Sequence, residues 1–413
     1  MLETHFSRLR SDVGDAVRQP DFATVRGRAR RVRRRRAVTA SSAALLVTVL
    51  TISGLGYATR TGPVASPPPV VNDGRPRMGL VVSAGSTLYS IVLPCDTCAM
   101  ELHASGDGGD TWLRRAEPPE ATGTDSSRLV SLFSLGRGIL AWNVRTVAVD
   151  ALATSPPTPS ERLWVTLDGA RSWHETTIDT EPVDVVPAGT QPVDCDRLNL
   201  TSCRVAAVSA TTGRFAPLAT QPTGITVLPG WQQRVNVPLD GRIWVPGVDP
   251  ATKKPAVASS SDAGRTWETH VFTDGVPAVL KGGGRTAENY LPQVAAGPDG
   301  TAYAMTYRSD GVVDVRYTAD GGKAWSPAVT LREFQQKPGF VAADGTHIVT
   351  TGAGLLAGRA GGRYEPVSLP GYPAEPRQTQ VTSRDAAEPY LVLSPTEPYL
   401  SRDGLTWRRI PLP

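Results

Sequence analysis

The sequence predicts an all-β domain behind a short membrane-anchoring segment, and three observations support this prediction. The chain of 413 residues contains 40 glycines and 36 prolines, which is typical of many short strands joined by turns. A pattern of Ser or Thr, Asp, Gly and Trp recurs five times between residues 105 and 407. An uncharged run, 37–59, directly follows an arginine-rich segment.

The N-terminal stub, residues 1–36, concentrates the positive charge of the chain. Residues 1–37 hold 11 of the 43 Lys and Arg residues but 4 of the 39 Asp and Glu residues, which leaves 32 basic and 35 acidic residues beyond them. The main body is therefore slightly acidic, and nucleic-acid binding is not predicted. Leu2, Phe6 and Leu9 begin a helical spacing, so a short amphipathic helix is expected. One hypothesis is that this helix binds a cytoplasmic partner. The other is that the stub only sets the orientation of the chain in the membrane.

The run 37–59 would extend for about 34 Å as a helix, enough to cross a bilayer. The arginines before it place the N-terminus in the cytoplasm and the residues after Arg60 outside. We therefore expect a single-pass protein of the cell membrane. A cleaved signal peptide ending near Ala58 is the alternative, and it would yield a secreted protein. Residues 60–77 read as a proline-rich linker to an extracytoplasmic domain, 78–413.

All four cysteines follow the predicted span, in an oxidising compartment where disulfides form. Cys195 and Cys203 would close a short loop and are the expected pair, although four cysteines allow three connectivities. A metal site at Cys95 and Cys98 would need a second close pair, which Cys195 and Cys203 do not supply. No metal is predicted.

The main domain is marked by five copies of one turn pattern. They run from Ser105 to Trp112, Thr166 to Trp173, Ser260 to Trp267, Thr318 to Trp325 and Ser401 to Trp407. In each copy Gly permits a positive φ, Asp accepts hydrogen bonds from the turn amides, and Ser or Thr adds a second local bond. The Trp then begins the outgoing strand, where its ring can pack between neighbouring sheets. Each copy therefore predicts a β-hairpin.

These turns resemble the Asp boxes, or BNR repeats, of sialidases and other Asp-box β-propellers, and the resemblance covers most of residues 78–413. It implies a β-propeller. The boxes are separated by 61, 94, 58 and 83 residues, and the two larger gaps can each hold a blade without a box. One such blade would run through Cys203–Pro217, and the other from Phe340 to Val367 with its turn at Ala360–Tyr364. Seven blades are expected, and the six of sialidases are the alternative.

In this family the box turns join the third and fourth strands of a blade, on the rim opposite the ligand-binding face. The resemblance therefore implies a structural role for the box residues Asp107, Trp112, Asp168, Trp173, Asp262, Trp267, Asp320, Trp325, Asp403 and Trp407. Function is expected in the loops between blades and in those joining second to third strands. The longest are Arg115–Ser127, Arg145–Glu161, Gly247–Lys254 and Asp274–Leu291.

A sialidase clamps a substrate carboxylate with three arginines and uses a tyrosine nucleophile beside a glutamate, with an aspartate as acid and base. Arg285, Glu288 and Tyr290 form the nearest local cluster and are the catalytic candidates. The segment starting at Met78 lacks the first clamp arginine of the family, which weakens the enzymatic reading. The five histidines form no metal-ligand spacing, and no cofactor is predicted.

The sequence therefore predicts a membrane-anchored, extracytoplasmic, sialidase-like β-propeller that binds a cell-envelope glycan or protein. The alternative is an exo-acting glycoside hydrolase of the exo-α-sialidase type. A third reading makes the propeller a sensor coupled through the span to the cytoplasmic stub. Because propellers host binding and catalysis alike, the fold does not choose among these functions.

Overall fold

The computed structural model divides the chain into two units, residues 1–69 and 70–413, and describes residues only in the second. The described ranges are 77–95, 98–119, 128–146, 161–194, 203–227, 241–275, 292–308, 312–332, 339–381 and 386–413. Within these ranges no helix is long and apolar enough to cross a membrane. The predicted stub 1–36 and span 37–59, with all but the last residue of the linker 60–77, lie outside them.

The described residues form strands and no helix, and the strands group into six four-stranded sheets and one two-stranded sheet. Sheets one and two contain β1 (Arg77–Ala84), β2 (Thr87–Leu93), β3 (Glu101–Ser105), β4 (Leu113–Arg114), β5 (Arg128–Gly136), β6 (Ile139–Thr146), β7 (Glu161–Thr166) and β8 (His174–Glu175). Sheets three and four contain β9 (Ala206–Val208), β10 (Phe215–Pro217), β11 (Thr226–Val227), β12 (Ile243–Val248), β13 (Pro255–Ser260) and β14 (Glu268–Val271). Sheets five to seven contain β15 (Gln293–Ala296), β16 (Ala302–Tyr307), β17 (Val313–Thr318), β18 (Val329–Leu331), β19 (Phe340–Val341), β20 (His347–Thr351), β21 (Gly354–Gly358), β22 (Glu365–Val367), β23 (Gln378–Val381), β24 (Tyr390–Leu393), β25 (Pro398–Ser401) and β26 (Arg408–Arg409).

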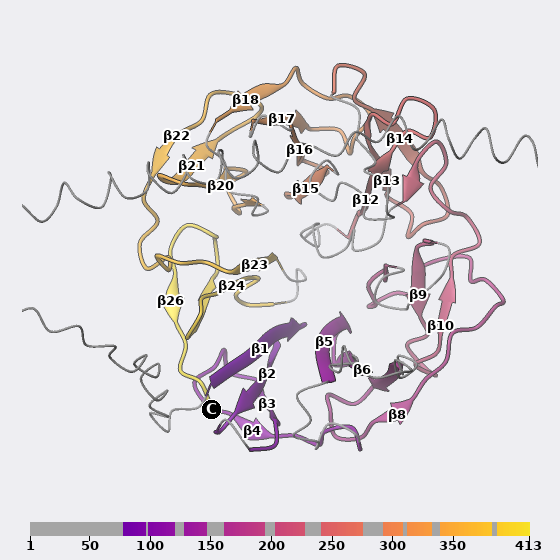
Figure 1. The fold of residues 1–413 in the computed structure, drawn as a ribbon, viewed down its shortest axis with the longest axis vertical. Coiled ribbons are helices and arrows are strands. Elements are labelled where there is room, and N and C mark those ends of the chain that lie inside the picture. The colour runs from indigo at the N-terminus through magenta and orange to yellow at the C-terminus, as the bar shows by residue number, and fades with distance from the viewer. Residues whose placement is uncertain are drawn as a thin grey trace, which may run out of the picture. The chain divides into compact units, whose positions relative to one another are not determined.

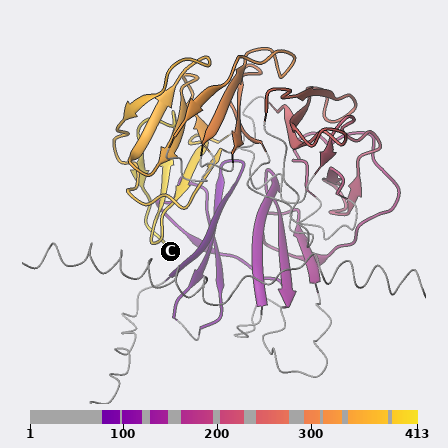
Figure 2. The same cartoon turned by 45° about the horizontal axis from the view of Figure 1, so that its top comes forward.

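Within residues 70–413 the sheets follow one another around a closed ring (Figures 1 and 2). Buried apolar clusters join each sheet to the next. Tyr89 of sheet one shares a cluster with Trp142 of sheet two, and Leu88 of sheet one shares another with Leu391 of sheet seven. Each sheet is built from strands that are consecutive in the sequence. Sheet one packs on both sheet two and sheet seven, so the ring is closed by side-chain packing between the first and last sheets. The described residues thus form an all-β, propeller-like assembly.

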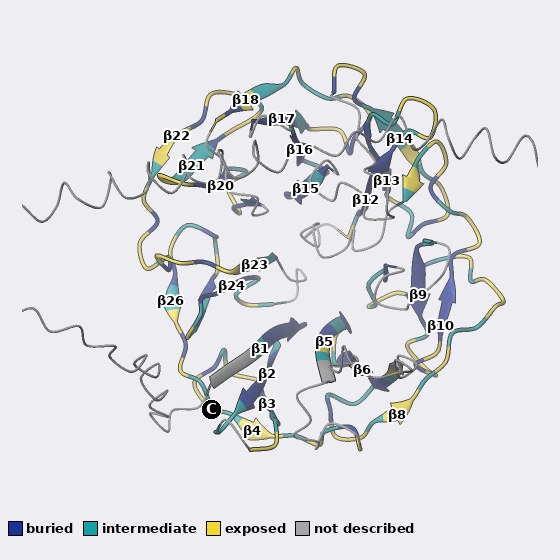
Figure 3. Cartoon of the chain, viewed as in Figure 1, coloured by how far each residue is buried: buried dark blue, intermediate teal, exposed yellow. Residues whose placement is uncertain are grey.

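Burial decreases from the middle strands of the sheets to their outermost strands (Figure 3). Every residue of β12 and β13 is buried, whereas both residues of β4 and both of β8 are exposed. Strands covered by sheets on both faces need continuous apolar sequence, while short, polar edge strands discourage pairing with other chains. The pattern explains why the core strands read as runs of Ala, Val, Ile and Trp.

The antiparallel order gives each sheet two functionally different ends. Turns joining first to second and third to fourth strands lie at one end, which we call the turn face. Connections joining second to third strands and successive sheets lie at the other end, which we call the loop face. The predicted functional loops Arg115–Ser127, Arg145–Glu161, Gly247–Lys254 and Asp274–Leu291 all make loop-face connections.

Sheet three departs from the four-stranded blade expected at Cys203–Pro217. Only β9 and β10 pair as strands there, and the partner outside β10 is an earlier segment that runs parallel to it. Val183 N donates to Pro217 O at 2.9 Å, and a parallel bridge joins Ile178 to Phe215. The segment that follows β8 thus pairs with the outer edge of β10 although it precedes β10 in the sequence, so the order of the chain does not reveal this pairing. Sheet six, in contrast, spans Phe340–Val367 as expected.

Candidate functional site

The five repeated turns each join the third and fourth strands of a sheet on the turn face. In sheet four, the Oγ of Ser260 accepts a hydrogen bond from Gly264 N and donates one to Asp262, both at 2.8 Å. Asp262 also accepts from the amide of Thr266 at 2.9 Å and from its hydroxyl at 2.6 Å. These bonds hold the pKa of Asp262 down at about 2. The carboxylate is therefore ionised and engaged within its own turn.

The turn tryptophans connect neighbouring sheets. Three of them donate their indole N–H to a carbonyl just beyond the last strand of the preceding sheet: Trp112 to Pro411 at 3.0 Å, Trp173 to Ala116 at 2.7 Å and Trp267 to Thr220 at 3.0 Å. The other two donate to a glycine of their own turn and pack on an aromatic ring of the preceding sheet, Trp325 on Phe272 and Trp407 on Phe340. Each ring thus stabilises one sheet against another.

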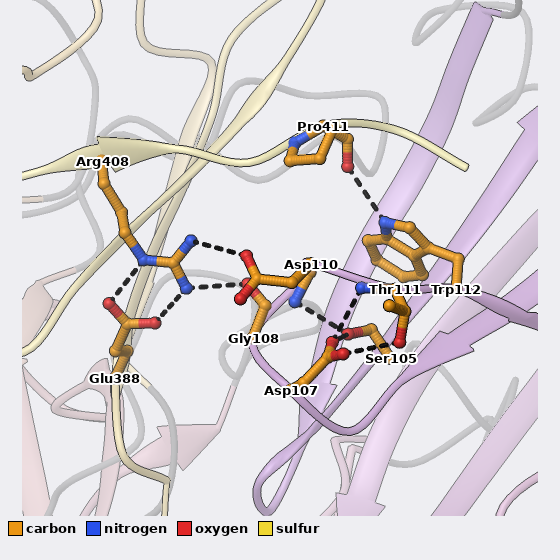
Figure 4. A network of polar contacts seen from close by, with 10 residues as sticks. Ser105, Asp107, Gly108, Asp110, Thr111, Trp112, Glu388, Arg408 and Pro411 are labelled. Carbon is orange, nitrogen blue, oxygen red and sulfur yellow. Dashed lines mark hydrogen bonds and ion pairs between the residues drawn. The ribbon is translucent and has the colours of Figure 1, made fainter.

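A polar network closes the ring where sheet seven meets sheet one (Figure 4). Arg408 forms a two-pronged pair with Glu388, with Nε 2.9 Å from Oε1 and Nη2 2.5 Å from Oε2. The same Nη2 donates to Gly108 O, the carbonyl in the repeated turn of sheet one, at 2.8 Å. Bidentate Arg–carboxylate pairs are strong and orient the guanidinium. The seam therefore has its own side-chain lock.

A cavity of about 520 Å³ lies beside this lock on the turn face. Its charged lining residues are Asp107, Asp110, Glu388, Arg402 and Arg408. Asp107 is bonded within its turn, and Glu388 is bonded to Arg408. These carboxylates are thus engaged in the turn and in the lock, so we assign the cavity to the seam.

The candidate binding site is a groove of about 750 Å³ on the loop face between sheets six and seven. One wall is the hairpin 350–355, the other is the connection 367–377, and Pro395 closes one side. All three segments make loop-face connections, and the structure describes every one of them. We call this hollow the 350–377 groove. Its position matches the face on which loops of rigid scaffolds usually carry binding residues.

The 350–377 groove combines an aromatic and proline-rich wall with two charges. Tyr372 is held from behind by the rings of Trp407 and Phe340, at 5.2 and 6.3 Å between centroids. Burial raises the pKa of Tyr372, so its hydroxyl stays protonated. Glu375 and Arg377 are exposed, and neither side chain has a hydrogen-bond or ion-pair partner among the described residues. Their charges are therefore available to a ligand.

A second loop-face feature lies at the start of the connection that carries the predicted catalytic cluster. Asp274 pairs with the guanidinium of Arg316 on β17, and Arg316 also lies 4.9 Å from the ring of Phe272. Arg285, Glu288 and Tyr290 themselves lie outside the described residues. Nothing in the local sequence marks Arg316 or Tyr372, because the residues that each of them contacts lie far away in the sequence.

The cysteines of the described residues are disulfide-bonded. Cys95 and Cys98 pair with each other on the loop face, in the connection between β2 and β3. Cys203 is also disulfide-bonded, while Cys195, its expected partner, lies outside the described residues. No cluster of three or more His, Cys, Asp or Glu side chains able to hold a metal occurs in the described part of the chain.

Comparison with known proteins identifies no family. No family model matches the chain, and no curated protein matches it. Among solved structures, the chain is similar to a prolyl endopeptidase (13% identity, 82% of this chain and 51% of that one, TM-score 0.44) and to YCF48 bound to D1 peptide (13%, 81% and 81%, 0.29). It is also similar to the GH74 enzyme of Niastella koreensis (11%, 80% and 48%, 0.23). The chain spans about half the length of the prolyl endopeptidase and of the GH74 enzyme. No TM-score among them reaches 0.5, so these likenesses assign no activity to the chain.

Proposed function

We propose that residues 78–413 are a seven-bladed β-propeller of the Asp-box type that binds a cell-envelope glycan in the 350–377 groove. The propeller would be held outside the cell membrane by the span 37–59. Seven sheets around one ring and five repeated turns at equivalent positions support the blade count and the family. The two-stranded sheet three would be the irregular blade.

The observation that carries the binding function is the composition of the 350–377 groove. The partly exposed ring of Tyr372 offers apolar surface on which a sugar ring can lie, and the buried prolines Pro373 and Pro376 line the groove beside it. The side chains of Glu375 and Arg377, which have no partner among the described residues, can bond to sugar hydroxyls. A volume of about 750 Å³ accommodates several sugar units.

Hydrolysis is the alternative function, and the groove itself favours binding. Glycoside hydrolases use two carboxyl groups flanking the scissile bond, and Glu375 is the one carboxylate among the described residues that line this groove. A sialidase site at Arg285, Glu288 and Tyr290 is tested separately. Turnover of a fluorogenic sialoside that Tyr290→Phe abolishes would establish the enzyme.

The binding proposal is tested with the full-length chain on purified peptidoglycan sacculi and on an immobilised glycan array. Glu375→Gln and Arg377→Gln are each expected to weaken retention about tenfold or more, since a charged hydrogen bond contributes about 1.5–3 kcal/mol. Arg363→Gln is the matched control, because Arg363 is exposed in the turn between β21 and β22 on the opposite face. Equal retention of all variants would reject the groove. Retention on a peptide library but on no glycan would make the ligand a protein.

A further inference from the structure

Sheet six contains a fully buried histidine at its boundary with sheet five. His347, the first residue of β20, is 0% exposed, whereas His103, His174 and His270 are each at least partly exposed. Its ring stacks on Tyr303 of β16, with centroids 4.4 Å apart, and meets Tyr364 of the turn before β22 edge-on. The three rings therefore join sheet five to both hairpins of sheet six.

The hydrogen bonds of these rings determine which nitrogen carries the proton. Nδ1 of His347 lies 2.5 Å from the hydroxyl of Tyr364, while Nε2 has no hydrogen-bond partner among the described residues. If Nδ1 carried the proton, both the Tyr364 O–H and the Nε2 lone pair would be left without partners. If Tyr364 donates to Nδ1, only Nε2–H is left, so the neutral Nε2–H form satisfies more groups.

In the part of the chain that the structure describes, no carboxylate contacts this imidazole. The groups that face it are Tyr303 from β16, Tyr364 from the turn before β22, and the backbone at Gly339. Tyr317 of β17 lies behind Tyr303, whose hydroxyl donates to Gly345 O and accepts from Ala360 N. Arg359 and Asp344, the charged side chains next to Tyr303, pair with each other at the surface. A protonated His347 would be a buried cation without a counter-charge.

Burial favours the neutral form of both partners of this hydrogen bond. It lowers the pKa of His347 to about 3 and raises the pKa of Tyr364. Protonation of His347 would also turn Nδ1 into a donor, so the Tyr364 hydroxyl would lose its acceptor. The closed arrangement of the three rings and the imidazolium form therefore exclude each other.

We propose that His347 makes the packing of sheet six against sheet five acid-sensitive, because the imidazole accepts a proton only when the sheets separate around Tyr303 and Tyr364. Acidification then favours the separated form. One proton is taken up when the sheets separate. Below the pKa of a solvated imidazole, each further unit of pH therefore increases the separated fraction about tenfold. This device is independent of any ligand in the 350–377 groove.

Hydrogen exchange of the full-length chain tests the proposal between about pH 7 and about pH 4.5, after correction for intrinsic exchange rates. Peptides from β15–β22 are expected to lose protection about tenfold per pH unit below about pH 6, while those from β11–β14 do not. In His347→Gln this loss should disappear, and in the control His270→Gln it should remain. Loss that is uniform over all seven sheets, or that persists in His347→Gln, would overturn the proposal.

A second measurement needs no variant, should His347→Gln fail to fold. Nitrogen-15 NMR of labelled histidines reports the tautomer and charge of each ring in the wild-type chain. The expected result is a neutral Nε2–H ring for His347 at about pH 5, where a free imidazole is mostly charged. If His347 instead carries a charge at about pH 5 while sheets five and six stay protected, the proposal is wrong.

Discussion

Nη2 of Arg316 lies 2.8 Å from Oδ2 of Asp274, and this ion pair ties sheet five to the connection that leaves sheet four. The side chain of Arg316 is 3% exposed, whereas the side chain of Asp274 is 62% exposed. An unpaired charge in the protein interior is costly. The stability of the buried Arg316 cation therefore depends strongly on Asp274, its one carboxylate partner among the described residues. The pair therefore fixes the start of the Asp274–Leu291 connection.

Asp274→Asn is expected to lower the free energy of unfolding by about 1–3 kcal/mol, between the small value of an exposed pair and the larger value of a buried one. The amide keeps the shape of the carboxylate but leaves the Arg316 guanidinium without a counter-charge. Urea unfolding measures the change. In an Arg316→Met background the same substitution should cost less than about 0.5 kcal/mol, because no buried charge remains. Equal costs in both backgrounds would show that the pair is not coupled.

The hydroxyl of Ser260 should matter more than its position in a surface turn suggests. It is 2% exposed and satisfies the amide of Gly264, so Ser260→Ala leaves a buried donor without a partner. The expected loss of unfolding free energy is about 1–3 kcal/mol. Ser261→Ala is the matched control, since Ser261 is exposed and has no hydrogen-bond partner among the described residues. Similar losses in both variants would contradict the role of the turn bonds.

The carboxylates of the repeated turns predict a second loss of stability, at lower pH than the separation attributed to His347. The pKa of Asp262 is about 2 in the fold and 3.8 in the reference state, so the unfolded chain binds more protons between these values. Stability contributed by Asp262 is therefore complete above about pH 4 and is lost as the pH falls towards about 2. Asp262→Asn should flatten the pH dependence of the urea midpoint in this window. An unchanged slope would mean that other groups control acid unfolding.

The repeated turns were predictable from sequence because each one is a local structure. Ser260, Asp262 and Thr266 lie within seven consecutive residues and bond to one another, so their spacing alone indicates the hairpin. Five copies supported the resemblance to Asp-box propellers, and that resemblance implied the strand order and the two ends of the sheets. Sheet six was located without a copy, from the length of chain between Asp320 and Asp403.

The candidate site was not predictable, because it is built from segments without a shared pattern. Tyr372 owes its position to Trp407 and Phe340, which are 35 and 32 residues away in the sequence. The outer partner of sheet three precedes its strands in the sequence, so the expected segment Cys203–Pro217 contains β9 and β10 but not that partner. His347 carried no motif, and its isolation in the interior is a property of packing alone.

The seam between sheets seven and one can be tested with two glycines of similar backbone conformation. Gly108 has φ of +75° and Gly345 has φ of +83°, so alanine strains the backbone similarly at both. A Cβ at Gly345 meets nothing within 4 Å, whereas one at Gly108 would lie 2.6 Å from Nη2 of Arg408. Gly345→Ala should therefore cost about 1–2 kcal/mol from strain alone, and Gly108→Ala about 1–2 kcal/mol more, because Arg408 must leave Glu388.

In an Arg408→Ala background the difference between the two glycine variants should vanish, since the guanidinium that collides with the new methyl group is gone. Urea unfolding of the four glycine variants, with wild type and Arg408→Ala as references, completes the cycle. If Gly108→Ala stays more harmful than Gly345→Ala without Arg408, the strain lies in the turn of sheet one. If the difference vanishes as expected, the collision with Arg408 accounts for the extra cost, and the lock formed by Arg408, Glu388 and the Gly108 carbonyl stabilises this seam beside the apolar cluster of Leu88 and Leu391.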